Sequence, residues 1–190
     1  DHVEAAEEVL KEMRIKEIHI TPQSHVKEAM QDLLAEAKKQ HVPIKEQIAG
    51  VTWQKGDALF RYIWPTDTNY EGNNDSLVLM MTYGAFKALF TGDLEEAGEQ
   101  VLIRQEGANI ANVDVLKAGH HGSKTSSSDA FIEHVKPRLT IFMAGKDNRY
   151  GHPHAEVVDR LKSRNLSYLT TGEEGTIEVR MNKHRMKVSK

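Results

Sequence analysis

The apolar positions of this chain change repeatedly between helical spacing and short strand-like runs. Apolar residues that recur every three or four positions predict helices, and compact or alternating runs bounded by turn residues predict strands. The expected helices cover residues 3–13, 22–40, 94–105, 129–135 and 157–164. The expected strands cover 15–20, 48–53, 58–64, two segments within 76–93, then 113–119, 138–145, 167–171 and 176–181. Helices interleaved with strands predict a layered α/β domain whose helices pack on sheet faces.

The length of the chain and its uninterrupted pattern predict one domain over residues 1–190. A chain of 190 residues is long enough to bury a single core, and it contains no internal repeat, low-complexity tract or linker. It has no run of 18 apolar residues that would span a membrane. The chain starts at Asp1 rather than at a methionine, and it shows no signal peptide, so we expect a piece of a longer protein.

Composition narrows the chemistry. The chain has no cysteine, which excludes disulfides and thiolate metal sites, whereas its ten histidines are potential imidazole ligands. The formal net charge of −3 provides no overall positive field for nucleic acid. The basic segment 180–190 is interpreted as a solvated tail, with a phosphate-attracting patch as the alternative. An anionic substrate would therefore need a metal ion or a small basic cluster.

Three polar clusters follow expected strands, where open sheets place their ligands. The first is Asp93, a carboxylate that is costly to bury unless it is paired or binds a cation. The alternative is that Asp93 caps the helix that begins at residue 94. The second is the pair His120 and His121 between two glycines, which suits metal ligation, although paired histidines are also common on protein surfaces.

The third cluster is the segment 148–156, in which His152 and His154 stand on either side of a proline. A loop or helix-cap role is the alternative for both histidines. The serines at 126–128 are interpreted as caps of the helix 129–135 rather than as nucleophiles, because no general base lies near them in the sequence. Together the three clusters predict a metal centre built from aspartate and histidine.

Four segments in order carry a resemblance to a known family. They are 73–79 (NNDSLVL), 90–93 (FTGD), 116–123 (LKAGHHGS) and 148–154 (NRYGHPH). Essentially the whole chain resembles the metallo-β-lactamase-like domain at the C-terminus of the ComEC family of bacterial DNA-uptake proteins. The resemblance implies an αββα sandwich. It also implies N-terminal truncation, because Asp1 and His2 match the end of the superfamily motif His-x-His-x-Asp-His, so the first sheet strands would lie upstream.

The resemblance implies a role for each matching residue. The implied metal ligands are Asp1, His2, Asp93, His121 and His152. The implied catalytic proton donors are His120 and His154, and the implied contacts to substrate phosphate are Asn74, Ser123, Lys124 and Thr125. His121 is favoured over His120 as the ligand, and His154 is the rival of His152. No histidine matches the superfamily ligand before the aspartate, where Asn73 or Asn74 stands instead, so Mn²⁺ is considered beside Zn²⁺.

The function implied by the resemblance is a metal-dependent phosphodiesterase, a DNase that degrades one strand of DNA during competence uptake. One or two divalent ions would activate the attacking water. With two upstream histidines missing, we expect this chain to bind metal poorly. The alternatives are a catalytically weak DNA-guiding module and a phosphodiesterase acting on a cell-wall or small-molecule ester. The expected partners are single-stranded DNA and the membrane channel portion of the parent protein. No soluble protein partner is evident, and we expect the domain on the extracellular side of the cell membrane.

Overall fold

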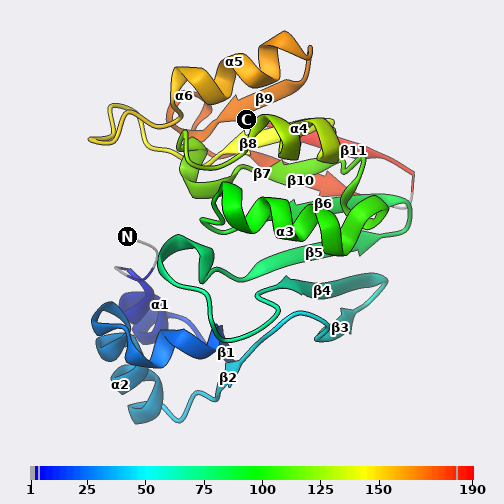
Figure 1. Ribbon diagram of the computed structural model, residues 1–190. Coiled ribbons are helices and arrows are strands. Elements are labelled where there is room, and N and C mark those ends of the chain that lie inside the picture. The colour runs from blue at the N-terminus through cyan, green and yellow to red at the C-terminus, as the bar shows by residue number, and fades with distance from the viewer. Residues whose placement is uncertain (1–2, 4, 183) are drawn as a thin grey trace.

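The computed structural model describes residues 3, 5–182 and 184–190. Its centre is a seven-stranded sheet with the order β3-β4-β5-β6-β7-β8-β9 (Figure 1). The strands are β3 Thr52–Lys55, β4 Ala58–Trp64, β5 Val78–Tyr83, β6 Phe86–Phe90, β7 Val115–Lys117, β8 Leu139–Phe142 and β9 Ser167–Thr170. Strands β3 to β6 pair antiparallel, and β6 to β9 pair parallel. Parallel neighbours need a crossover, which the helices of the C-terminal half supply.

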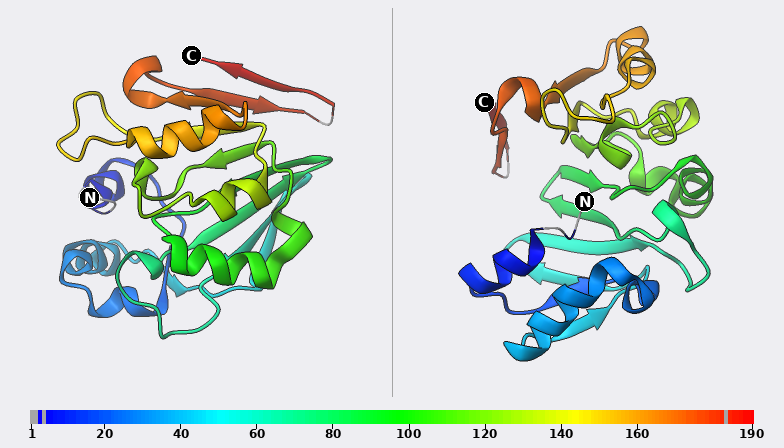
Figure 2. Two further views of the ribbon diagram at one scale, coloured as in Figure 1. Left: turned by 45° about the horizontal axis from the view of Figure 1, so that its top comes forward. Right: turned by 90° about the vertical axis from the view of Figure 1, so that its left-hand side faces the viewer.

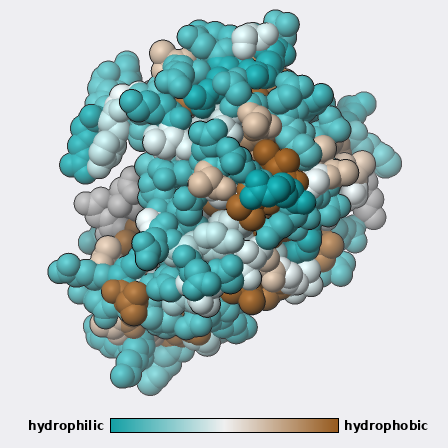
Figure 3. Space-filling view, in the orientation of Figure 1, coloured by the Kyte–Doolittle hydropathy of each residue, from teal (hydrophilic) through white to brown (hydrophobic). Residues whose placement is uncertain are grey.

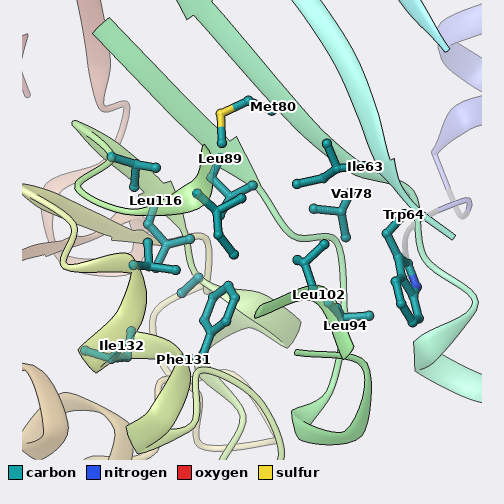
Figure 4. Close-up of a cluster of buried hydrophobic side chains, with 14 of the residues drawn as sticks. Ile63, Trp64, Val78, Met80, Leu89, Leu94, Leu102, Leu116, Phe131 and Ile132 are labelled. Atoms are coloured by element: carbon teal, nitrogen blue, oxygen red, sulfur yellow. The ribbon is translucent and has the colours of Figure 1, made fainter. Parts of the chain in front are cut away.

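Three helices cover one face of this sheet. They are α3 Glu96–Glu106, α4 Asp129–Val135 and α5 Ala155–Ser163, and they lie on one side in Figure 2. Successive strand residues point to opposite faces, and this alternation turns Met80, Leu89 and Leu116 toward the helices. There they join the buried side chains of Phe131 from α4 and Leu102 from α3 (Figure 4). This core anchors the strands whose ends carry the polar clusters.

The opposite face of the sheet is also apolar but is covered only in part. The hairpin of β10 Glu178–Met181 and β11 Met186–Ser189 lies on this side, after the short helix α6 Thr171–Glu174 (Figure 2). A groove of about 450 Å³ between the hairpin and the sheet is lined mainly by apolar side chains, including Met81, Phe90 and Ile141. The basic segment 180–190 is therefore no solvated tail over its described residues, because Val188 pairs with Val179 within this hairpin.

The N-terminal part adds a small sheet and a further helix layer. Strands β1 Ile18–Ile20 and β2 Ile44–Glu46 pair parallel, and the ring of His19 contacts Trp53 and Tyr62 of the large sheet. Helices α1 Ala6–Glu12 and α2 Gln31–Lys39 pack on the other side of the β1–β2 pair in a second core that includes Leu10 and Ile20. The layers therefore run helix, small sheet, large sheet, helix. This arrangement confirms the predicted α/β class and its αββα layering.

The expected helix over 22–40 is wrong in its first half. The chain forms two 3₁₀ turns, Pro22–Val26 and Glu28–Met30, before α2 begins at Gln31. Lys27 between the turns has an extended backbone, and its Nζ reaches Asp75 Oδ2 at 2.6 Å. The Gln31 side chain donates hydrogen bonds to the carbonyls of residues 25 and 27. The Lys27–Asp75 ion pair and the Gln31 side chain therefore replace regular helix hydrogen bonds in this segment. The periodicity of apolar residues does not reveal such contacts.

The bounds of the other helices and strands differ less from the predicted ones. The strand β2 was not expected, and the strand expected over 48–53 lies at Thr52–Lys55. The helix predicted over 129–135 is observed with the same bounds, and Ser128 caps it by accepting a hydrogen bond from Phe131 N at 3.3 Å. The face seen in Figure 3 is mainly hydrophilic with scattered apolar patches. Within the described part of the chain, every helix is too short or too polar to cross a lipid bilayer.

Candidate metal centre

The carboxyl ends of β6, β7 and β8 lie side by side and carry the three polar clusters. The strand registers align Phe90, Lys117 and Ile141 in one row. Because these strands are parallel, the segments that follow them leave the sheet at the same edge, which is where α/β sheets bind ligands. Three segments follow in this way: the turn 91–93, the 3₁₀ segment Gly119–Gly122, here called the double-histidine loop, and the segment 148–154, here called the GHPH loop.

Asp93 is held at the end of β6 by a tight turn. Gly92 has a φ of +58°, and a Cβ at this position would lie 3.0 Å from the Ser76 side chain, so this turn strongly favours glycine. The Oγ of Ser76 accepts a hydrogen bond from Asp93 N at 3.1 Å. Only 13% of the Asp93 side chain is exposed. A carboxylate so far removed from water requires a positive or hydrogen-bonding partner.

Lys117 at the end of β7 supplies a fixed positive charge beside Asp93. Its Nζ lies 3.7 Å from Asp93 Oδ1 and donates a hydrogen bond to Gly92 O at 2.7 Å. Burial lowers the pKa of Lys117, and the neighbouring Asp93 carboxylate partly offsets that shift. Lys117 was not predicted as a site residue, because a lysine at the end of an expected strand resembles an ordinary sheet residue. Its position directly before the double-histidine loop was the available signal.

The double-histidine loop has an unusual backbone. His120 and His121 both have a positive φ, +45° and +55°. Residues other than glycine rarely adopt this conformation, and such strain is concentrated at functional sites. The turn directs the two neighbouring rings differently, with their centroids 6.3 Å apart and their planes at 64°.

The hydrogen bonding of His121 suits a metal ligand. Its Nδ1 lies 2.7 Å from the carbonyl oxygen of Met143. A carbonyl oxygen only accepts, so Nδ1 carries the proton and the neutral ring keeps its lone pair on Nε2. That Nε2 lies 3.8 Å from Asp93 Oδ1, a separation that two ligand bonds of about 2.0–2.2 Å would span. A backbone carbonyl behind a metal-binding imidazole is a common supporting contact.

Asp93 and His121 are thus a pair of predicted ligands that come close enough to share one ion. Among the residues that the structure describes, no group of three or more His, Cys, Asp or Glu surrounds a single metal position. The predicted ligands Asp1 and His2 lie outside the described residues. The donor chemistry of an oxygen and an imidazole nitrogen fits a divalent ion such as Mn²⁺ or Zn²⁺.

His152, from the GHPH loop, lies among the other three histidines of the site. Its ring centroid is 5.6 Å from that of His120, 6.4 Å from that of His121 and 4.8 Å from that of His154. Burial lowers the pKa of His152, and charge on the three neighbouring histidines lowers it further, whereas Asp93 acts in the opposite sense. The neutral imidazole is the form that binds metals, so this environment agrees with the predicted role.

His154 has the opposite tautomer to His121. Its Nδ1 accepts a hydrogen bond from the backbone N of Lys124 at 3.0 Å. A nitrogen that accepts carries no proton, so in the neutral ring the proton is on Nε2. The neutral His154 ring therefore carries a donor at Nε2, whereas His121 carries a lone pair there. The tautomers differ because His121 Nδ1 faces a backbone carbonyl and His154 Nδ1 faces a backbone N–H.

His120 faces a third kind of environment. Its Nδ1 lies 3.4 Å from Asn73 Nδ2, 3.5 Å from Thr125 Oγ1 and 3.6 Å from Glu95 Oε1. We call Asn73, Glu95 and Thr125 the His120 cage. Glu95 was not predicted as a site residue, because one acidic residue at the start of an expected helix over 94–105 looks like ordinary helix composition.

The four predicted substrate contacts differ in accessibility. Ser123 is buried, and its Oγ lies 3.1 Å from Thr125 Oγ1. Asn74 uses its Oδ1 to accept a hydrogen bond from the backbone N of Glu95. Thr125 and Lys124 are exposed, and Thr125 donates to the Glu95 carboxylate. Lys124 is therefore the member of this set that offers an exposed positive charge to a phosphate.

Comparison with known proteins places this geometry in context. The chain is 38% identical to ComE operon protein 3 of Bacillus subtilis (strain 168) over 182 residues, which are 95% of this chain and 23% of that protein. It is 35% identical to competence protein ComA of Neisseria gonorrhoeae over 127 residues, which are 66% of this chain and 18% of that protein. The chain thus spans about a quarter or less of the length of these curated relatives. No family model matches it.

Among solved structures, the fold is similar to that of CmlA, a diiron beta-hydroxylase from Streptomyces venezuelae. The TM-score is 0.52 at 10% identity, over 84% of this chain and 39% of that one. At this identity the likeness concerns the fold alone. The layered fold, with polar clusters at the carboxyl ends of its parallel strands, is thus shared with a solved metalloenzyme structure. The alignments add that this domain belongs to the ComEC family of competence proteins.

Proposed function

We propose that the domain is a metal-dependent phosphodiesterase that cleaves one strand of DNA during competence uptake. The observation that carries the proposal is the approach of the Asp93 carboxylate and the His121 Nε2 lone pair to 3.8 Å at the sheet edge, with three further histidines beside them. The kinship with competence proteins supports DNA as the substrate. Single-stranded DNA is the expected form.

Asp93 and His121 would hold the divalent ion, and Asp1, His2 and His152 remain in the proposed ligand set. The chemistry that Mn²⁺ or Zn²⁺ would supply there is a lowered pKa for the attacking water and neutralisation of charge on the phosphoryl oxygens. Met143 O keeps the His121 lone pair directed at the site. Lys117 holds the backbone next to Asp93 through its bond to Gly92 O.

The remaining side chains would handle protons and phosphate. His154 presents an Nε2 proton, so it is the proposed donor to the leaving oxygen. His120 is the second candidate for proton transfer. Lys124, exposed beside His154, would pair with a flanking phosphate of the strand.

The proposed setting is a much longer membrane protein, because the aligned segments make up only 23% and 18% of the two matched relatives. The domain would act beside the channel portion of the same protein on the extracellular side of the membrane. We also propose that the first strands of the sheet lie upstream of residue 1 in that longer protein, as the family resemblance implies.

A catalytically weak DNA-guiding module is the second candidate. One observation favours it: Lys124 is exposed beside His154 and offers a positive charge to a phosphate, a contact that binds DNA without any hydrolysis. In that case the histidines and Lys124 would bind the DNA backbone without hydrolysing it.

The test uses the whole protein with Mn²⁺, Mg²⁺ or Zn²⁺ and three substrates: labelled single-stranded DNA, duplex DNA and bis(p-nitrophenyl) phosphate. We expect cleavage of single-stranded DNA that His121→Ala abolishes. His25→Ala is the control, because His25 pairs with Glu46 outside the site. Binding of DNA without cleavage in any metal would favour the guiding module, and cleavage of the small diester alone would favour a different phosphodiester substrate.

A further inference from the structure

The His120 cage brings together three segments that are distant in sequence. Asn73 belongs to the 3₁₀ turn Gly72–Asn74 after β4, Glu95 directly precedes α3, and Thr125 follows the double-histidine loop. All three side chains approach the same atom, His120 Nδ1, within 3.4–3.6 Å. The three side chains therefore all contact the same edge of the His120 ring, the edge that carries Nδ1.

Glu95 is the centre of the cage. Its Oε1 accepts a hydrogen bond from Thr125 Oγ1 at 2.8 Å and another from Asn73 Nδ2 at 3.1 Å. The backbone on either side is also fixed, since Glu95 N donates to Asn74 Oδ1 and the following N, at Glu96, donates to Thr125 O. The carboxylate therefore has little freedom to leave the ring.

Glu95 does not play the helix-capping role expected of an acidic residue at a helix start. Glu95 is the N-cap residue of α3, yet its side chain makes no capping hydrogen bond to that helix. The side chain instead connects two loops at the site. Glu95 and His120 remain partly accessible, with 30% and 25% of their side chains exposed, so the pair adjoins solvent and any bound substrate.

We infer that Glu95 is a positioning residue for His120, an inference that rests on the proposed phosphodiesterase function. The cage engages the Nδ1 edge of the ring and leaves Nε2 to meet the phosphodiester. The distance of 3.6 Å between Glu95 Oε1 and His120 Nδ1 is longer than a hydrogen bond. Catalytic hydrogen bonds are often long before substrate binds and tighten in the complex. Partners that orient metal-binding histidines typically contribute about 10–100-fold to activity, and we expect a contribution of this size at His120.

The chain offers a matched set of variants. Both hydrogen bonds within the cage end on one oxygen, Oε1, which glutamine retains. In the whole protein, Glu95→Ala should lower kcat for single-stranded DNA by about 10–100-fold with KM unchanged, and Glu95→Gln should restore kcat to within about tenfold of wild type. Glu96→Ala is the control, because Glu96 is exposed and lies next to the same helix start.

A readout independent of activity separates this inference from the proposed function. In ¹⁵N spectra of the histidine rings, we expect His120 to show one ordered ring environment in wild type and in Glu95→Gln, and an averaged one in Glu95→Ala, with the unfolding midpoint unchanged. Unaltered kcat or unaltered His120 signals in Glu95→Ala would overturn the positioning role. If wild type cleaves no diester while the His120 signals respond as described, the proposed function fails and the cage stands as a structural clamp only.

Discussion

Asp93 and Glu99 lie on the same short stretch of chain, and both carboxylates are removed from water, but their partners differ. Glu99, in α3, is fully buried and accepts hydrogen bonds from the backbone N of Ser127 at 2.5 Å and of Ser128 at 3.0 Å. Asp93, at the sheet edge, faces the ammonium of Lys117 and the imidazole of His121. The partners of Glu99 are thus backbone N–H groups, whereas those of Asp93 are side chains that can gain or lose a proton.

The difference separates the structural role of Glu99 from the chemical role proposed for Asp93. Arg160 donates to the carbonyls of Ser126 and Ser127, so the loop that Glu99 binds is held through its donors and its acceptors together. Backbone groups cannot leave without moving the loop, and such a network rigidifies the protein. Around Asp93, the partners are side chains that can move without displacing the backbone, as the proposed divalent ion would require. Substitutions at the two carboxylates should therefore affect different properties of the protein.

The largest effect is expected for activity at Asp93. Asp93→Asn should lower phosphodiester cleavage by more than about 100-fold, because partners outside the ligand shell already cost about 10–100-fold and Asp93 is a proposed ligand. Its free energy of unfolding should stay close to that of wild type, since an asparagine side chain retains the shape of the aspartate. Cleavage assays and urea denaturation check both parts. Activity near wild type would reject the ligand role.

The reverse pattern is expected at Glu99. Glu99→Ala should lower the free energy of unfolding by about 2–4 kcal/mol, because two buried backbone N–H groups lose their acceptor. The folded fraction should retain its specific activity. Urea denaturation combined with activity per folded molecule measures the contrast, and a loss below about 1 kcal/mol would show that water replaces the carboxylate.

Stability should also depend on pH through Glu99. Burial raises the pKa of Glu99 from 4.5 to about 7, while hydrogen bonds from Ser128 and Ser127 oppose the shift. Between these values the native state binds more protons than the unfolded state, so stability falls as pH rises from about 4.5 to 7, by at most about 1.4 kcal/mol per pH unit. Glu99→Gln should remove this component. Unfolding curves of both proteins at matched pH values give the difference, and parallel pH profiles would contradict the assignment.

The smallest effect is expected at a third carboxylate, which sharpens the comparison. Asp114 accepts a hydrogen bond from Lys87 N and pairs with Arg138 at 2.7 Å, but 65% of the Arg138 side chain is exposed. Exposed ion pairs contribute little, so Arg138→Ala should cost less than about 1 kcal/mol of unfolding free energy and leave activity unchanged. Thermal and urea denaturation suffice to test it. If Arg138→Ala lost as much unfolding free energy as Glu99→Ala, the side-chain partner of Asp114 would be as stabilising as the backbone partners of Glu99.

Much of the fold followed from local pattern. The helix over 129–135 and its Ser128 cap, the strand at Ala58–Trp64 and the α/β class agree with the structure. The helix expected over 22–40 failed because Lys27 pairs with Asp75, far along the chain. The strand β11 was missed because its alternation is short and its surroundings are largely basic.

The sequence by itself determined which polar side chains follow three of the strands, since apolar periodicity and turn residues act over a few positions. It did not determine which nitrogen of each histidine carries the proton. Only the tertiary structure decided that for two of them, by placing Met143 O behind His121 and Lys124 N against His154. The physical reason is that a tautomer depends on one neighbouring donor or acceptor, and these neighbours come from segments brought together by the order of the parallel strands.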